Sequence, residues 1–258
     1  TGSSDISTGT SVINSFNVST FDSAFYFLVT RDDVNNKLDL RRHSLTHDDT
    51  TAVVNTFGQV MSDNDNSFIT VDADVNSNLA RLNATGQSVS NSVSLYRIVL
   101  GQSTTNSTSG NTAFVVNTDV DSAVENIDTW SASTYRGAQY FISATNATTG
   151  EASNMEALVV TDGTSAFITA YGNVNTGNND LIELTADVSG GNVRLRASGR
   201  TPNTRVAMYR ILLGDSESSS AGSSVNVIGA TTVSSASTTL DTFSSDDYHG
   251  AMYLVVGH

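Results

Sequence analysis

The chain contains no cysteine, one proline, one lysine and one tryptophan among its 258 residues. Without cysteine it has neither a disulfide framework nor thiolate ligands for a metal ion. No apolar run approaches the ~20 residues that span a bilayer. Hydrophobic residues nevertheless make up 38% of the chain, which is enough to fill the cores of compact domains.

Acidic residues outnumber basic residues by 26 to 12, which gives a formal net charge of −14. Binding to nucleic acid or to an anionic membrane depends on Lys and Arg side chains that neutralise phosphate. The charge therefore predicts that neither nucleic acid nor an anionic lipid surface is a partner. The absence of a long apolar run predicts that the chain does not insert into a membrane. An acidic surface poor in lysine also keeps a protein soluble in salt, which fits a saline exterior.

The chain repeats itself. Its only tryptophan, Trp130, and the nearby Tyr140 return as aromatic residues 243 − 130 = 113 positions downstream, and they have equivalents 130 − 16 = 114 positions upstream. A fixed step of this size is typical of tandem domains. The matched aromatic residues are Phe16, Trp130 and Phe243 in one set, and Tyr26, Tyr140 and Tyr253 in the other.

The repeat predicts how the chain is divided. Residues 1–101 form a first β-sandwich repeat and 128–214 a second, each preceded or followed by Ser/Thr-rich sequence. Residues 102–127 and 215–240 are each expected to open with a flexible spacer and to end in a strand that enters the next domain. Residues 241–258 are the start of a third repeat or exchanged strands. This last segment is too short to close a sandwich, so we expect it to pair with strands outside the two full repeats, either later in a longer polypeptide or in a neighbouring subunit.

Short apolar stretches alternate with Asn, Asp, Gly, Ser and Thr, and no long stripe has the 3.6-residue period of a helix. The pattern predicts an all-β fold of tandem antiparallel β-sandwiches with about seven strands each, the third repeat being incomplete. Two hairpin turns are expected, one of type I′ at 161–164 and a second at 189–192. Four tyrosines are expected inside their domains, each with its hydroxyl at a polar partner: Tyr26, Tyr96, Tyr140 and Tyr209.

Two groups of residues have metal-ligand character. His43 and His47 could form a metal pair or a general-base cluster, but a strand would hold the two rings ~13 Å apart, and the second repeat has Ala157 and Thr161 there. We therefore expect an exposed strand end. Oxygen-rich alternation typical of calcium loops occurs in a second group, which lacks the glycine and the final glutamate of an EF-hand, so turns are favoured. These weak calcium candidates are Asp63, Asp65, Asp119 and Asp121.

Charged residues recur in both full repeats. They predict a structural ion-pair network inside each sandwich, with a carboxylate-binding site as the alternative. None of the shared residues is a nucleophile beside a base, and the chain has neither a Gly-x-Ser-x-Gly elbow nor a phosphate-binding glycine loop. The sequence thus predicts a protein that is not an enzyme, with no catalytic or cofactor residues. The recurring charged residues are Asp74 and Asp187, Arg81 and Arg194, and Arg97 and Arg210.

The segment from Trp130 to Ile142, followed by residues 156–164 and 187–195, resembles a repeat found in long structural and tail-fibre-like proteins of marine tailed phages, including those of cyanobacteria. The resemblance implies a virion fibre, decoration or appendage at the virion or extracellular surface. Its expected partners are further copies of itself, other structural proteins or surface glycan. The first repeat departs from the pattern, with Asp22-Ser23 in place of Arg136-Gly137. The alternatives are an adhesin or filament subunit of a bacterial or archaeal surface and, third, a glycan-binding or glycan-processing protein.

Overall fold

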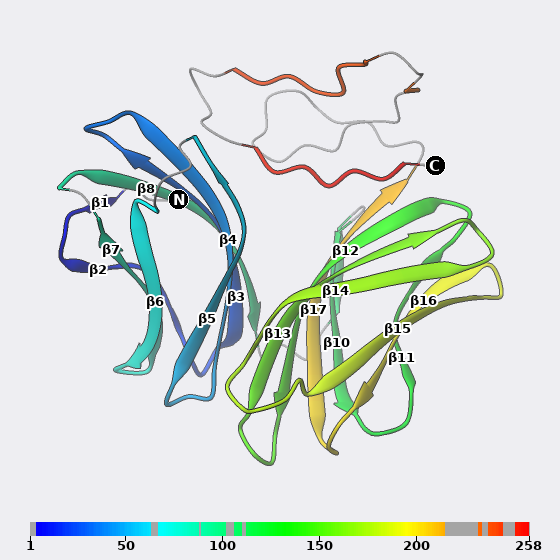
Figure 1. Cartoon of the computed structure of the whole chain (residues 1–258). Coiled ribbons are helices and arrows are strands. Elements are labelled where there is room, and N and C mark those ends of the chain that lie inside the picture. The colour runs from blue at the N-terminus through cyan, green and yellow to red at the C-terminus, as the bar shows by residue number, and fades with distance from the viewer. Residues whose placement is uncertain are drawn as a thin grey trace.

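A computed structural model describes residues 4–62, 67–87, 89–101, 106–109, 112–214, 232–233, 237–244 and 251–257. Over these residues the chain forms antiparallel β-sheets and no helix (Figure 1). The described part of the chain therefore has no helix that is long and apolar enough to cross a membrane. The predicted all-β, antiparallel fold class is confirmed.

The first sandwich is built from strands β1 to β8. Sheet A has five strands in the order β1-β8-β3-β4-β5, and sheet B has three in the order β2-β7-β6. The strands are β1 (Ser4–Ile6), β2 (Thr10–Asn17), β3 (Phe21–Asp32), β4 (Lys37–His47), β5 (Ala52–Met61), β6 (Ile69–Asn76), β7 (Leu79–Gly86) and β8 (Asn91–Gly101).

The second sandwich repeats this order. Sheet C runs β14-β13-β12-β17-β10-β9 and sheet D runs β11-β16-β15. Its strands are β9 (Ser107–Ser109), β10 (Thr112–Val120), β11 (Glu125–Ser131), β12 (Tyr135–Asn146), β13 (Ala152–Thr161), β14 (Ala166–Asn175), β15 (Ile182–Ser189), β16 (Asn192–Gly199) and β17 (Thr204–Gly214). Part of the expected flexible spacer is thus a strand, because Ser107–Ser109 pairs with β10.

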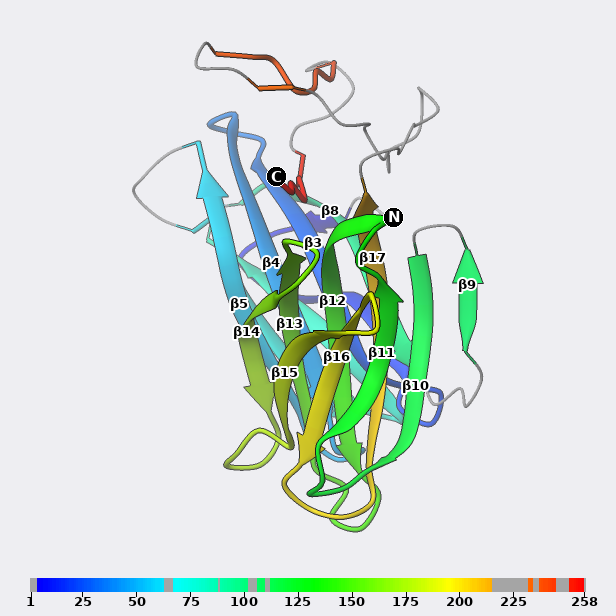
Figure 2. The ribbon, with the colours of Figure 1, turned by 90° about the vertical axis from the view of Figure 1, so that its right-hand side faces the viewer.

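The four sheets stack in the order B, A, C, D (Figures 1 and 2). One apolar core lies between sheets A and B, a second between C and D, and a third between A and C, the facing sheets of the two sandwiches. Strand β3 shows why. Tyr26 and Leu28 point into the first core, while Phe25 and Phe27 point into the third, because successive residues of a strand face opposite sides.

Bulges fall at matched positions in the two sandwiches. The register slips between Val12 and Asn14 in β2 and between Asn126 and Asp128 in β11, a spacing of 128 − 14 = 114 residues. A bulge re-aims the side chain beside it. Here it turns Asn14 and Asp128 toward the tyrosine of the facing sheet.

Two of the four expected tyrosines are buried as predicted. Tyr26 and Tyr140 lie in the sandwich cores, and burial raises the pKa of both hydroxyls. Tyr26 donates to Oδ1 of Asn14 at 3.3 Å, and Tyr140 donates to Oδ2 of Asp128 at 2.8 Å. The prediction was wrong for Tyr96, which is 48% exposed.

The position of Tyr96 has a simple cause. The register pairs Tyr96 with Phe27 and Tyr209 with Phe141, so both tyrosines lie on the outward faces of sheets A and C. Tyr209 is half-buried and packs against the third core. Because apolar residues occur on both faces of β8 and β17, the sequence pattern did not show which face of each strand lies inside its sandwich.

The two predicted hairpins differ in their turns. Gly190 and Gly191 both have positive φ, 58° and 77°, as a type I′ turn requires. At 161–164 only Gly163 has positive φ, at 93°, so the type I′ prediction was wrong there. The side chain of Asp162 instead accepts hydrogen bonds from the backbone N–H groups of Thr164 and Ser165, which closes the turn by another route.

Replacing Tyr140 by alanine is expected to lower the free energy of unfolding by about 3–5 kcal/mol. The ring is fully buried, and its hydroxyl also accepts a hydrogen bond from Trp130 Nε1 at 2.8 Å. Urea denaturation followed by circular dichroism measures the loss. Phe167→Ala is the matched control, because that ring is 60% exposed and its loss should cost less than about 1 kcal/mol. Equal losses in the two variants would contradict the assignment.

Candidate interaction site: the face shared by the two sandwiches

The face between sheets A and C is not part of either sandwich core. Phe25 and Leu100 of the first sandwich and Phe141 and Ala207 of the second are all fully buried there. Phe25 and Phe141 meet edge to face with ring centroids 5.2 Å apart, a favourable geometry for aromatic pairs. The two sandwiches are therefore joined by a continuous apolar layer.

A row of side chains crosses each outward face at right angles to the strands. In sheet A the register pairs Phe27 with Arg42 and Arg42 with Phe57. In sheet C it pairs Phe141 with Glu156 and Glu156 with Tyr171. Each row thus places one charged residue between two aromatic residues. We call these two sets of three residues the axial rows.

The axial rows lie against each other, and every member meets its own equivalent. Ring centroids are 6.0 Å apart for Phe27 and Phe141 and 6.1 Å apart for Phe57 and Tyr171. Arg42 forms an ion pair with Glu156. The separations are 141 − 27, 156 − 42 and 171 − 57, each 114. Residues meet their own equivalents along a two-fold axis, so a local two-fold axis runs along the rows.

Contacts away from the rows agree with this symmetry. A two-fold axis reverses strand direction, so a residue before the row in one sandwich should meet a residue after it in the other. Asn55 is two residues before Phe57, and its Nδ2 donates at 3.0 Å to the carbonyl of Asn173, two residues after Tyr171. The face is therefore self-complementary in the manner of a symmetric dimer, although it joins two parts of one chain.

The central ion pair is enclosed by aromatic rings. The guanidinium carbon of Arg42 lies 5.4 Å from the ring centroids of Phe27 and Phe57 and 5.7 Å from that of Tyr171. Glu156 is 1% exposed, and its Oε2 also accepts hydrogen bonds from Gln139 Nε2 at 2.9 Å and the Tyr171 hydroxyl at 3.3 Å. A buried charge needs such partners, because its desolvation otherwise exceeds the Coulomb gain.

Gly172 allows the rows to approach. Its φ is +67°, and a Cβ atom added there would lie 2.8 Å from the Phe57 ring. Any other residue would strain the backbone and push Phe57 away from Tyr171. Gly58 occupies the equivalent position in β5, with φ of +60°, and 172 − 58 is again 114.

Polar contacts border the aromatic centre. Nδ2 of Asn154 donates to the carbonyl of Leu45 at 2.8 Å, and Oγ of Ser44 donates to the carbonyl of Gly172 at 3.0 Å. At the far end, Nη1 of Arg205 lies 2.5 Å from Oδ2 of Asp22. A largely apolar face with a polar border is the usual anatomy of a specific protein interface.

The recurring charged residues do not gather at this face. Arg81 binds Asp74 and Arg194 binds Asp187 within sheets B and D, and these side chains are partly exposed. The hydrogen bond from each arginine lowers the pKa of its aspartate. Such partly exposed pairs add little stability.

Arg97 and Arg210 form a separate set. Nη1 of Arg97 donates to Oδ1 of Asn14 at 2.6 Å, and Nη1 of Arg210 binds Oδ1 of Asp128 at 2.6 Å. Each arginine thus joins the acceptor that already receives a core tyrosine. The third copy has the beginning of the same motif, because the hydroxyl of Tyr253 donates to Oδ2 of Asp241 at 3.0 Å.

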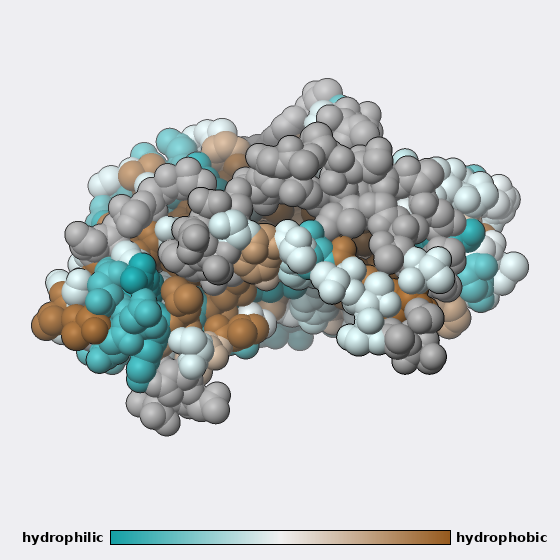
Figure 3. Space-filling view, turned by 90° about the horizontal axis from the view of Figure 1, so that it is seen from above, coloured by the Kyte–Doolittle hydropathy of each residue, from teal (hydrophilic) through white to brown (hydrophobic). Residues whose placement is uncertain are grey.

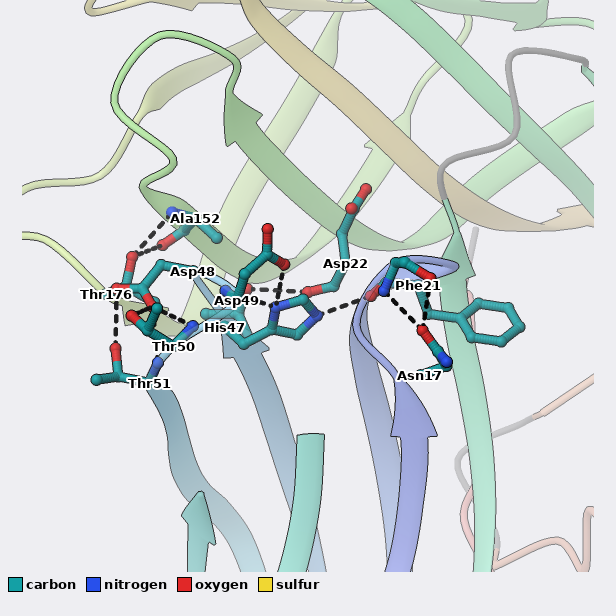
Figure 4. A network of polar contacts seen from close by, with 12 residues as sticks. Asn17, Phe21, Asp22, His47, Asp48, Asp49, Thr50, Thr51, Ala152 and Thr176 are labelled. Atoms are coloured by element: carbon teal, nitrogen blue, oxygen red, sulfur yellow. Dashed lines mark hydrogen bonds and ion pairs between the residues drawn. The ribbon is translucent and has the colours of Figure 1, made fainter. Parts of the chain in front are cut away.

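The two histidines lie inside the first sandwich, so the expected exposed strand end was wrong. Both residues are buried and share the inward face of β4 with Leu45. Nδ1 of His43 is 2.9 Å from the hydroxyl of Thr56. Nε2 of His47 is 2.7 Å from the carbonyl of Phe21, toward which its ring points in Figure 4. A partner for each ring compensates for burial.

The calcium candidates are divided between described and undescribed parts of the chain. Asp63 and Asp65 lie outside the described residues. Asp119 and Asp121 are exposed, and Oδ1 of Asp121 accepts a hydrogen bond from the N–H of Ala123 at 2.7 Å, which is a turn contact. Within the described ranges, no three His, Asp or Glu side chains are grouped so as to hold a metal ion.

The axial rows were not found from the sequence, although two signals were present. Strands β3 and β8 carry apolar residues on both faces, and Arg42 aligns with Glu156, a charge reversal between equivalent positions of the two repeats. A second ion pair was also missed: Arg41 Nε donates to Oδ2 of Asp39 at 2.7 Å in the first sandwich, with both residues buried. Comparison with protein-family models and with curated proteins finds no match to the chain.

His43 should make stability depend on pH. Burial, together with the charge of Arg41, lowers the pKa of His43 from 6.5 to about 4. In the unfolded chain His43 therefore binds a proton as the pH falls below about 6.5, whereas in the folded chain it stays neutral until about pH 4. The stabilisation is present above pH 6.5, and about 3 kcal/mol is lost as the pH falls to 4.

Urea denaturation across this pH range measures the effect. His43→Ala copies the residue at the matched position, Ala157. It should be less stable at neutral pH, but its free energy of unfolding should change less with pH, by up to ~1.4 kcal/mol per pH unit. The free energy of unfolding at neutral pH reports the loss of packing, and its change with pH reports the titration of His43. Parallel slopes for the two proteins would show that His43 is not the titrating group.

Proposed function

We propose that the chain is a non-enzymatic structural repeat protein whose sandwiches form a fibre, decoration or appendage of a virion. The observation that carries this proposal is the face between sheets A and C. It consists of apolar side chains and of polar groups that bind one another, as in a protein interface. The resemblance of residues 130–142 to phage structural repeats supports the virion as the owner.

The packing of the two sandwiches on each other supports a stiff unit. Strands β9 and β10 lie between β8 and the rest of the second sandwich, and β10 pairs with β17. These strands therefore belong to the second sandwich, and the apolar layer between sheets A and C holds the first sandwich against it. A fibre or appendage needs such stiffness.

The contacts of the third copy of the motif differ from those expected from the sequence. Residues 251–257 form no strand in the structure, and a Cβ atom added at Gly137 would lie 2.6 Å from Cγ2 of Val256. This segment, red in Figure 1, therefore touches the second sandwich, whereas pairing outside the two repeats was expected. Residues 225–231 and 245–250 lie outside the described residues.

The exposed side chains of the third copy are consistent with a further partner. Met252, Tyr253 and Val255 are each more than two-fifths exposed. Seen from the side where this segment lies, hydrophobic residues form brown areas on the surface (Figure 3). Exposed apolar groups of this kind favour contact with another protein surface.

The alternative owner is a bacterial or archaeal cell surface. An adhesin or filament subunit would use the same paired sandwiches, acidic surface and absence of cysteine. Glycan binding or processing comes third. A hollow of about 310 Å³ is lined by Asn17, Val18, Ser19, Asp49 and Asn78, but Oδ1 of Asn17 already accepts two hydrogen bonds from Ser19.

Immunogold electron microscopy with an antibody to the folded chain tests the proposal. Virus-sized particles and cells from a sample that contains the protein are separated by filtration and labelled in parallel. Antibody that has been absorbed by the pure chain is the control. We expect gold on fibres or the surface of the particles. Gold on cell-surface filaments alone would show that the protein is an adhesin or filament subunit of a cell surface and not a virion protein. Signal confined to the soluble fraction would overturn both.

A further inference from the structure

We propose that Arg42 and Glu156 decide which sandwiches pair. A sandwich with arginine at the centre of its axial row would pair with one carrying glutamate, and like sandwiches would be kept apart. The inference rests on the proposed function in one respect, namely that the faces of sheets A and C are assembly surfaces. It adds that each sandwich pairs with one that carries the opposite charge at the centre of its axial row.

The local two-fold axis makes the argument direct. In any pair with this geometry, each residue of an axial row meets the residue at the equivalent position of the partner. Two first sandwiches would place Phe27 on Phe27 and Phe57 on Phe57. Two second sandwiches would place Phe141 on Phe141 and Tyr171 on Tyr171. All these contacts are aromatic, so they do not discriminate between partners.

The central position discriminates. Two first sandwiches would bring Arg42 onto Arg42, and two second sandwiches would bring Glu156 onto Glu156. In the structure the side chains are 18% and 1% exposed, respectively, so water would screen such a repulsion poorly. A buried charge facing a like charge has lost its solvent and gained no partner. Specific interfaces use unfavourable contacts of this kind to exclude wrong partners.

A second charged contact points the same way. Arg205 of the second sandwich pairs with Asp22 of the first. The residue of the second sandwich equivalent to Asp22 is Arg136, since 136 − 22 = 114. Two second sandwiches would therefore bring Arg205 to Arg136, again two positive charges. Both charged positions of the face favour the pairing of unlike sandwiches.

Charge reversal in the full chain tests the proposal. Arg42→Glu leaves two glutamates at the centre, Glu156→Arg leaves two arginines, and the double variant Arg42→Glu/Glu156→Arg exchanges the signs. Arg81→Glu makes the same charge change in sheet B, away from the face, and is the matched control. Light scattering after size exclusion gives the mass, sedimentation velocity the compactness, and circular dichroism the fold.

Each single variant should sediment more slowly than the wild type, because its sandwiches separate, while the double variant and Arg81→Glu should match the wild type. Mixing the two single variants should create a species of at least twice the chain mass, since every central glutamate of one variant then meets a central arginine of the other. Neither variant should form this species alone.

Unchanged sedimentation of both single variants would overturn the proposal, as would a mixture that stays at the mass of one chain. If the single variants fail to fold, the double variant decides. Recovery of the fold and compactness supports charge matching, and no recovery refutes it. Immunogold labelling uses the native protein alone, so labelled fibres with a failed charge test would retain the structural function and remove only the pairing rule.

Discussion

Strands β3 and β12 have to bury both of their faces, and the rest of the structure depends on this constraint. Tyr26 and Tyr140 fill the sandwich cores, whereas Phe27 and Phe141 point the opposite way from the neighbouring positions. A three-stranded sheet covers only one face, so an isolated sandwich would expose its outward aromatic residues to water. Pairing the five-stranded sheet with the six-stranded sheet removes that surface, at roughly 25 cal/mol per Å² of apolar area.

The polar groups act at two levels. Within each sandwich, Asn14 or Asp128 gathers a buried tyrosine and an arginine, which ties sheet B to A and sheet D to C. Between the sandwiches, Arg42 and Glu156 do the same for sheets A and C. A buried ion pair is weak evidence for stability. Its clearer consequence is the choice of partner. Aromatic contacts alone accept several partners, whereas a buried charge is stabilised only by a group of the opposite charge.

These features support the proposed structural role. The charged groups of the shared face are held by one another and by Gln139 and Tyr171, and the buried histidines bind Thr56 and a backbone carbonyl. The virion and the cell surface make the same physical demands on such a protein, namely solubility, stiffness and repeated use of one interface. The residues within the sandwiches therefore do not distinguish a virion protein from a cell-surface protein.

The all-β class and the matched core tyrosines could be predicted from the amino-acid sequence, because alternation and the step of 113 or 114 residues are properties of the chain itself. The sequence did not reveal that Tyr96 faces outward, that His43 lies in a core or that Ser107–Ser109 joins a sheet, since each depends on what covers a strand. Arg42 and Glu156 were visible as a charge reversal between aligned positions. That these two residues meet follows from the placement of sheet A on sheet C about a local two-fold axis, because contact across that axis joins positions 114 residues apart, and no local pattern specifies such a contact.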